Sequence, residues 1–305
     1  MMTQSSLRSW FETARPKTLP LAVAIILTGS ALAYRQGAFS WRLTLLCLLT
    51  ATLLQILSNF ANDYGDYQKG SDTTERIGPL RAIQQGQINA EQLRKGLWVA
   101  ALLCLLSGGT LIWLAYRSMA DLVVFAGLGA AAIVAAITYT VGKKPYGYLG
   151  LGDISVFIFF GLLAVSGTYY LQTHSLDGAV FLPAAACGLL SSAVLNINNL
   201  RDIEQDKKAG KRTLIVHIGP EKGRVYHCLL LGLALLCYLL FALFYIRQAS
   251  GFLFILAAPL LLRHARFVYS SKRPEALRPM LAQMSLLALL TNVLFSLGLC
   301  LSVWL

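Results

Sequence analysis

Residues 43–66 read LTLLCLLTATLLQILSNFANDYGD, an uncharged run over 43–62 followed at once by Asp63 and then by Asp66. A helix needs about 20 mostly apolar residues to cross the roughly 30 Å hydrocarbon core of a bilayer. The run has this length and therefore predicts a transmembrane helix. Its two carboxylates are expected just beyond the apolar region, at one membrane surface.

The rest of the chain repeats this pattern. Hydrophobic residues make up 56% of the 305 residues, charged residues make up 13%, and the mean hydropathy is +0.61. Soluble domains carry about 25% charged residues, so this composition excludes a soluble or disordered chain, and six cysteines are too few for a disulfide scaffold. Runs without charged residues or histidine cover 18–34, 43–62, 96–116, 122–142, 154–173, 178–200, 228–246, 248–262 and 279–305. They predict a single all-α integral membrane domain over 1–305 with nine transmembrane helices.

The basic residues predict the orientation of these helices. Lys and Arg in loops concentrate on the cytoplasmic side of a membrane. With nine spans and a cytoplasmic N-terminus, only Arg35, Arg42, Arg117 and Arg247 of the 26 basic residues lie outside. This favours the short run 248–262 as a true span, because five more bases would otherwise lie outside. Insertion and anionic lipid account for the net charge of +12, so no nucleic-acid partner is expected.

Two cytoplasmic loops carry related polar motifs. The pattern Asn-(Asp/Asn)-x-x-Asp occurs at Asn62–Asp66 after the second run and at Asn198–Asp202 after the sixth. Carboxylates that face one another across a cavity repel unless a cation lies between them, and oxygen ligands suit Mg²⁺. Neighbouring Arg and Lys residues bind phosphate oxygens. A solvated loop with ordinary ion pairs is the alternative for one such motif, but its recurrence on one side favours a metal–diphosphate site.

Polar residues near these motifs allow two interpretations each. Asn59 and Asn196 lie within uncharged runs, where they either face a cavity or form hydrogen bonds between helices. The segment 138–153 ends one helix, turns through Gly and Pro, and begins the next near Asp153. Tyr139 in this segment either lines a substrate pocket or belongs to the aromatic belt of the membrane interface.

At these residues the chain resembles the UbiA-type intramembrane prenyltransferases, and within them the branch that acts on naphthoate. The resemblance covers nearly the whole chain. The segments that carry it are 14–20 (ARPKTLP), 59–66 with Lys69–Asp72, 76–81 (RIGPLR), 146–153 (YGYLGLGD) and 196–206 (NINNLRDIEQD). One departure is that glycine occupies position 70, four residues after Asp66, where the general family pattern has a third aspartate, and the next acid is Asp72.

The resemblance implies a fold, an activity and a set of site residues. It implies nine helices around a central cavity, in a bacterial cytoplasmic (inner) membrane, with the active site facing the cytoplasm. It implies that Mg²⁺ binds a polyprenyl diphosphate and that the polyprenyl group passes to 1,4-dihydroxy-2-naphthoate with loss of CO₂, giving demethylmenaquinone in menaquinone biosynthesis. The metal ligands expected are Asp63, Asp66, Asp72, Asp202 and Asp206, and Tyr139 is the candidate for stabilising an allylic cation. The substrate-binding residues expected are Asn59, Asn62, Lys69, Arg76, Arg81, Lys143, Asn198, Asn199 and Lys211.

Two other functions compete with this prediction. A sister prenyltransferase that uses 4-hydroxybenzoate or another acceptor has the same chemistry and the same motifs. A membrane transporter also carries paired motifs in two halves. The acids of this chain cluster at one face, and the interiors of its uncharged runs contain no ionisable group other than Cys and Tyr, which disfavours the transporter.

Overall fold

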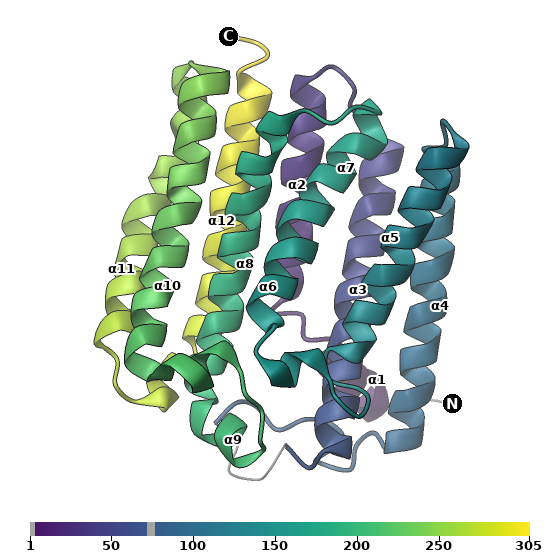
Figure 1. Ribbon diagram of the computed structural model, residues 1–305, viewed down its shortest axis with the longest axis vertical. Coiled ribbons are helices and arrows are strands. Elements are labelled where there is room, and N and C mark those ends of the chain that lie inside the picture. Colours follow the sequence, from purple (N-terminus) through teal and green to yellow (C-terminus); the bar gives the residue numbers. More distant parts are fainter. Residues whose placement is uncertain (1–3, 72–76) are drawn as a thin grey trace.

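The computed structural model describes residues 4–71 and 77–305, and every regular secondary-structure element within these ranges is a helix. Long helices run side by side in one bundle, with α1, α9 and several connecting segments at one end and the C-terminal end of α12 at the other (Figure 1). The α-helices are α1 (Gln4–Thr13), α2 (Leu19–Arg35), α3 (Trp41–Gln68), α4 (Ala90–Leu114), α5 (Met119–Thr138), α6 (Gly152–Val156), α7 (Ala164–Thr173), α8 (Phe181–Arg201), α9 (Ile203–Lys208), α10 (Leu214–Phe241), α11 (Ala258–Ser270) and α12 (Met280–Leu301).

Shorter 3₁₀ and π segments extend several of these helices. The π-helical η2 (Phe157–Leu163) joins α6 to α7, and η4 (Ala242–Ile246) prolongs α10. The 3₁₀ segments η3 (Gly178–Val180), η5 (Ala249–Ala257) and η6 (Pro274–Leu277) precede α8, α11 and α12, and η1 (Tyr146–Leu149) lies in the connection before α6. Within the described ranges, eight such continuous helical stretches are long and apolar enough to cross a membrane.

The remaining apolar helix is α2, which has 17 residues and is therefore shorter than the other eight. The short uncharged run 248–262 provides the first part of a helical stretch of 22 residues, which begins at Ala249 and ends at Ser270. The stretch is long enough to cross a membrane because the helix continues past Arg263 into a basic segment beyond the uncharged run.

The core of the bundle is built on α8, which packs against α10, α12 and the η2 segment. Small residues allow this close approach: a Cβ on Gly161 of η2 would lie 2.6 Å from the carbonyl oxygen of Ala184. Close backbone contact at Gly and Ala is the usual way in which helices associate in a membrane. The opposite edge is looser, and no residue of α5 is buried. The bundle therefore has one tightly packed side and one side where α4 and α5 contact α3 (Figure 1).

Candidate active site

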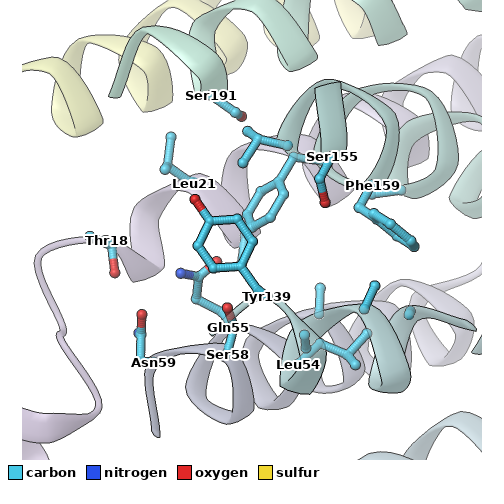
Figure 2. Close-up of a pocket in the computed structure, with 18 of the residues that line it drawn as sticks. Thr18, Leu21, Leu54, Gln55, Ser58, Asn59, Tyr139, Ser155, Phe159 and Ser191 are labelled. Carbon is cyan, nitrogen blue, oxygen red and sulfur yellow. The ribbon is translucent and has the colours of Figure 1, made fainter. Parts of the chain in front are cut away.

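A cavity of about 380 Å³ opens between α2, α3, α5, α7 and α8. Its mouth contains polar and charged side chains from the two motif loops, and its inner walls are mainly apolar. Figure 2 shows that Asn59, Ser58 and Gln55 of α3 line one wall, with Phe159 on another and the ring of Tyr139 in view between them. The cavity therefore connects a charged mouth with an apolar interior.

The first motif lies on the last turns of α3, because this helix continues past the uncharged run to Gln68. Asp66 faces the cavity and is 8% exposed. Its Oδ1 accepts a hydrogen bond of 2.8 Å from the hydroxyl of Tyr148, and the Nζ atom of Lys211 lies 3.9 Å away. Side chains from two other connecting segments, the one before α6 and the one after α9, therefore contact the Asp66 carboxylate.

Asp63 has a different environment from Asp66, although it lies on the same helix. It is 1% exposed and lies behind the cavity wall, where it forms ion pairs with Arg15 and, at 3.2 Å, with Arg81. Arg15 precedes Pro16 and has a left-handed backbone with φ of 54°, a conformation that costs energy in a non-glycine residue. Burial lowers the pKa of Arg81 to about 10, with a further contribution from the charge of Arg15, against the opposing effect of Asp63. Asp63 thus holds two guanidinium groups at the cavity mouth.

The second motif does not continue as a straight helix. Helix α8 ends at Arg201, Asp202 separates it from α9, and Asp206 lies on α9. The bond from the backbone N–H of Asp206 to the carbonyl oxygen of Asp202, 2.8 Å, keeps one helical turn between the two acids. The Arg201 guanidinium donates two hydrogen bonds, of 2.7 and 2.6 Å, to the carboxylate of Asp202. Both acids line the cavity.

Lys211 connects the two motifs. It follows α9, lines the cavity, and its pKa depends on groups from both sides. Burial alone would lower the pKa of Lys211, but the carboxylates of Asp66 and Asp206 outweigh burial and raise it above its ordinary value. The ring of Tyr148 lies beneath the ammonium group at 5.2 Å. The ammonium group of Lys211 is therefore charged and lies among Asp66, Asp206 and the Tyr148 ring, where the two motifs meet.

The connection between α5 and α6 places two tyrosines at the site. Tyr139 lines the cavity and packs against glycines, so that a Cβ on Gly147 would lie 2.8 Å from its Cε1 and a Cβ on Gly152 would lie 2.7 Å from its hydroxyl oxygen. Burial raises the pKa of Tyr139 to about 12. Tyr148 contacts Asp66 and Ser71 through its hydroxyl, and its carbonyl oxygen accepts a bond from the N–H of Arg212. These contacts join all three loops.

Most of the residues predicted from sequence meet at this cavity. The lining includes Asn59, Asn62, Asp66, Arg81, Tyr139, Asn198, Asn199, Asp202, Asp206 and Lys211. Lys143 is exposed and lies away from the cavity, and Lys69 is exposed with its ammonium group 5.4 Å above the Tyr148 ring. Asp72 and Arg76 lie outside the described residues. Of the two asparagines with open interpretations, Asn59 donates to the carbonyl oxygen of Ala14 and Asn196 to that of Gly223.

The structure brings to the site several residues that could not be predicted from the sequence motifs. Arg15 belongs to the family segment 14–20, and its place in an Arg–Pro pair before an apolar run is the only signal in the sequence for its role. Tyr148 gave no signal of its own, because its contacts with Asp66 and Lys211 join residues that are far apart in the chain. Gln55, Ser58 and Ser191 lie inside uncharged runs, where the absence of charge concealed them.

The donor groups at the mouth fit a hydrated Mg²⁺ ion. Within residues 4–71 and 77–305, no three His, Cys, Asp or Glu side chains lie close enough to hold one ion. Mg²⁺ usually keeps several waters and binds through one or two carboxylates together with substrate phosphates. Asp66 faces the cavity from one side, and Asp202 and Asp206 face it from the other. This arrangement suits an ion that takes its remaining oxygens from water and diphosphate.

The chain that forms this site is similar to proteins of a known family. The model of the UbiA prenyltransferase family matches residues 22–295. The chain belongs to this family. The 1,4-dihydroxy-2-naphthoate octaprenyltransferase of Haemophilus influenzae is 64% identical over 98% of this chain and 97% of the relative. The protein of the same name from Escherichia coli is 55% identical over 98% and 97%.

The fold is also that of solved family members. A UbiA homologue from Archaeoglobus fulgidus bound to GPP and Mg²⁺ aligns with a TM-score of 0.59 and 16% identity, over 94% of this chain and 99% of the other. At this identity the likeness concerns the fold. As a UbiA family member with eight candidate spans within the described residues, the chain is a multi-pass membrane protein and a prenyltransferase.

Proposed function

We propose that this UbiA family member transfers a polyprenyl group from a polyprenyl diphosphate to 1,4-dihydroxy-2-naphthoate, with release of diphosphate and CO₂. The observation that carries the proposal is the meeting of Asp66, Asp206 and Lys211 at the mouth of an otherwise apolar cavity. The names of the two close relatives support the acceptor and suggest an octaprenyl donor. The product is the quinol form of demethylmenaquinone.

The bundle crosses the inner membrane nine times in this proposal, with α2 as the ninth span. Helix α1 and the C-terminal end of α12 lie at opposite ends of the bundle, as an odd number of crossings requires (Figure 1). The distribution of Lys and Arg supports a cytoplasmic N-terminus. Because α1 and α9 lie at the same end, the mouth of the cavity then faces the cytoplasm.

Asp66, Asp202 and Asp206, which all line the cavity, would hold Mg²⁺ in this proposal. The Mg²⁺ and GPP in the Archaeoglobus fulgidus homologue support it. The charges of this chain support it as well, because the four motif aspartates already face four bases, namely Arg15, Arg81, Arg201 and Lys211. The bases therefore leave the negative charge of a bound diphosphate largely uncompensated. When bound, Mg²⁺ supplies this charge and makes diphosphate a better leaving group.

Arg15, Arg81 and Lys211 bind the diphosphate oxygens. Asp63 fixes both arginines by ion pairs, so that we assign Asp63 to their positioning and not to the metal. Arg76 and Asp72 of the same loop remain candidates from sequence. Guanidinium groups held in this way need little reorganisation when the substrate arrives.

The apolar part of the cavity protects the reacting centre. The bond from C1 of the prenyl chain to the diphosphate oxygen breaks, the C1 atom bonds to the carboxyl-bearing ring carbon, and that carbon loses CO₂. Exclusion of water prevents hydrolysis of the electron-deficient prenyl group. Tyr139, held in one orientation by Gly147 and Gly152, presents an aromatic ring in the cavity to this group.

Turnover by the purified protein in nanodiscs tests the proposal. Octaprenyl diphosphate and Mg²⁺ are supplied with 1,4-dihydroxy-2-naphthoate or with 4-hydroxybenzoate in parallel reactions, and the lipid product, CO₂ and diphosphate are measured. We expect product and CO₂ with the naphthoate alone, and none after EDTA treatment or in Asp66→Ala and Asp202→Ala. Product with 4-hydroxybenzoate alone would contradict the acceptor assignment, and turnover in EDTA would contradict the metal.

A further inference from the structure

Helix α1 exposes two large apolar side chains at the end of the bundle where α9 also lies (Figure 1). Leu7 is 59% exposed and Phe11 is 63% exposed. Because they are four residues apart, they lie on one face of the helix. The neighbouring face carries the exposed ion pair between Arg8 and Glu12, at 3.0 Å. The helix therefore combines a charged face with an apolar face that is open to its surroundings.

Two contacts fix the rotation of α1 about its axis. The hydroxyl of Ser9 donates a 2.8 Å hydrogen bond to the Oε1 atom of Gln87, in the segment that precedes α4. The ring of Trp10 packs against that of Phe60, with 5.4 Å between the centroids, and a Cβ on Gly96 would lie 2.5 Å from it. Gly96 lies about 9 Å along the axis of α4 from the first residue of that helix. Ser9 therefore points toward the connecting segment, and Trp10 points toward the bundle.

These contacts direct Leu7 and Phe11 toward the membrane. Each lies two residues from Ser9, which is about 200° around a helix, so both are on the side opposite to Ser9. Since Ser9 faces the connecting segment, the opposite side faces the apolar part of the bundle. The depth of α1 is that of a bilayer surface, because Phe60 belongs to the last turn of the uncharged run 43–62. The apolar face of α1 therefore lies over the edge of the hydrocarbon region.

Basic residues near α1 favour a lipid surface as the partner of this face. Arg8 and Lys17 are exposed, and so are Arg94 and Lys95, which directly precede Gly96. The proposed orientation places these residues at the cytoplasmic leaflet, whose anionic lipids attract exposed Lys and Arg. A face of Leu and Phe with basic residues beside it is typical of helices that lie in the plane of a membrane surface.

Helix α1 leads directly into the segment that carries Arg15. The N–H of Ala14 donates to the carbonyl oxygen of Trp10 at 3.0 Å, and the carbonyl oxygen of Ala14 accepts the 2.8 Å bond from Asn59. Arg15 follows with its left-handed backbone and pairs with Asp63. A helix held at the membrane surface limits the positions open to this segment, so that lipid contacts of α1 act on the orientation of Arg15.

We propose that α1 is a lipid anchor, in which Leu7 and Phe11 insert among the acyl chains of the leaflet on the side of the cavity mouth, and that this anchor positions Arg15 for the donor diphosphate. The positioning part rests on the proposed function, whereas the insertion of α1 does not. Leu7 and Phe11 are positioning residues, because they act on the substrate only through Arg15.

Spin labels on α1 test the insertion directly. Leu7→Cys, Phe11→Cys and the matched control Glu12→Cys are labelled with a nitroxide in the full-length protein, in nanodiscs of phosphatidylethanolamine and phosphatidylglycerol. The unsubstituted protein, labelled in the same way, gives the background from the six native cysteines. We expect the labels on the apolar face to collide more with oxygen, which concentrates in the bilayer, than with a water-soluble nickel chelate. The label at the control position should show the reverse.

Two results would overturn the anchor. Labels on the apolar face that favour the nickel chelate as strongly as the control label would place this face in water. Labels that are shielded from both reagents would show that a protein partner or a second copy of the chain covers it.

Kinetics test the positioning of Arg15. The double variant Leu7→Ser/Phe11→Ser should raise the KM of polyprenyl diphosphate about 3- to 30-fold, with kcat within about twofold of the wild type. The conservative variant Leu7→Met/Phe11→Leu, which keeps the face apolar, should restore the wild-type KM. An unchanged KM in the serine variant, or an equal loss in both variants, contradicts the positioning role.

The dissociation constant of an unreactive thiodiphosphate analogue of the donor gives the same comparison without turnover. A wild-type protein whose labels insert and whose serine variant binds this analogue more weakly, but which transfers no prenyl group, supports the anchor and contradicts the proposed function. Wild-type turnover with labels that face water contradicts the anchor alone.

Discussion

Replacing Tyr148 by phenylalanine removes one hydroxyl from the point where the three cytoplasmic loops meet. The hydroxyl donates to the Oδ1 atom of Asp66 at 2.8 Å and contacts Ser71, and both Tyr148 and Asp66 are buried. The phenylalanine ring preserves the contacts with the ammonium groups of Lys211 and Lys69, which lie 5.2 and 5.4 Å from the ring centre. The substitution therefore isolates the hydrogen bond to the carboxylate.

The size of the effect follows from this bond. A hydrogen bond to a charged group contributes about 1.5–3 kcal/mol, which corresponds to a factor of about 10 to 150 in an equilibrium constant. Loss of a partner that orients a metal-binding carboxylate typically weakens metal affinity about 10- to 100-fold. We therefore expect Tyr148→Phe to raise the Mg²⁺ concentration for half-maximal transfer by about 10- to 100-fold.

The assay is a Mg²⁺ titration of octaprenyl transfer at saturating donor, with thermal unfolding measured in parallel. Tyr64→Phe is the control, because its hydroxyl accepts an exposed hydrogen bond from Gln68 on the same helix; its Mg²⁺ requirement should match the wild type within about twofold. A Tyr148→Phe protein with lower thermal stability but a wild-type Mg²⁺ requirement would refute the reasoning, since the bond would then serve the fold alone.

Three further perturbations are expected to separate the roles at the mouth. Asp63→Asn removes the buried carboxylate that pairs with Arg15 and Arg81 and should lower the free energy of unfolding by about 3–5 kcal/mol in denaturant titration; an unchanged value would contradict its pairing role. Gly152→Ala places a methyl group against the Tyr139 hydroxyl, at 2.7 Å, and should reduce kcat about 10- to 100-fold while the donor KM is unchanged. The pKa of Lys211 is raised in the folded protein, so the stabilisation from its charge is complete below about pH 10 and is lost only above that. The difference in Tm between the wild type and Lys211→Met should therefore be constant from about pH 7 to about pH 9.5. A decline in this difference within the window would count against the charged pair with Asp66.

The transmembrane helices could be predicted from sequence because an apolar run of sufficient length has few other solutions in a membrane. The same argument located Asp66, since helix α3 simply continues past its uncharged run. It could not assign Asp63 and Asp66 to different roles. Both lie near one face of the helix, and only the arrival of Arg15 and Arg81 from distant segments directs Asp63 away from the cavity.

The second motif and the inner cavity were less accessible to prediction. Helix α8 ends at Arg201, beside its ion pair with Asp202, and α9 begins at Ile203, yet the two acids stay one helical turn apart; no motif in the sequence predicts this break. The places of Gln55 and Ser191 in the cavity could not be predicted, because the uncharged runs were defined by the absence of charge and contain Gln and Ser as well as Leu. Their significance depends on which face of a helix lines the cavity, and that is fixed by tertiary packing.

The central claim is that the two motifs form a single Mg²⁺-dependent diphosphate site. Equilibrium binding of a polyprenyl diphosphate, with Mg²⁺ and with EDTA, tests it most directly in the wild type, Asp66→Asn, Asp206→Asn and the double variant. We predict that EDTA abolishes binding by the wild type, that each single variant weakens Mg²⁺-dependent binding at least about tenfold, and that the double variant is little worse than either, because groups acting as a unit are not additive. Binding that persists in EDTA, or single effects that add fully in the double variant, would contradict a shared site.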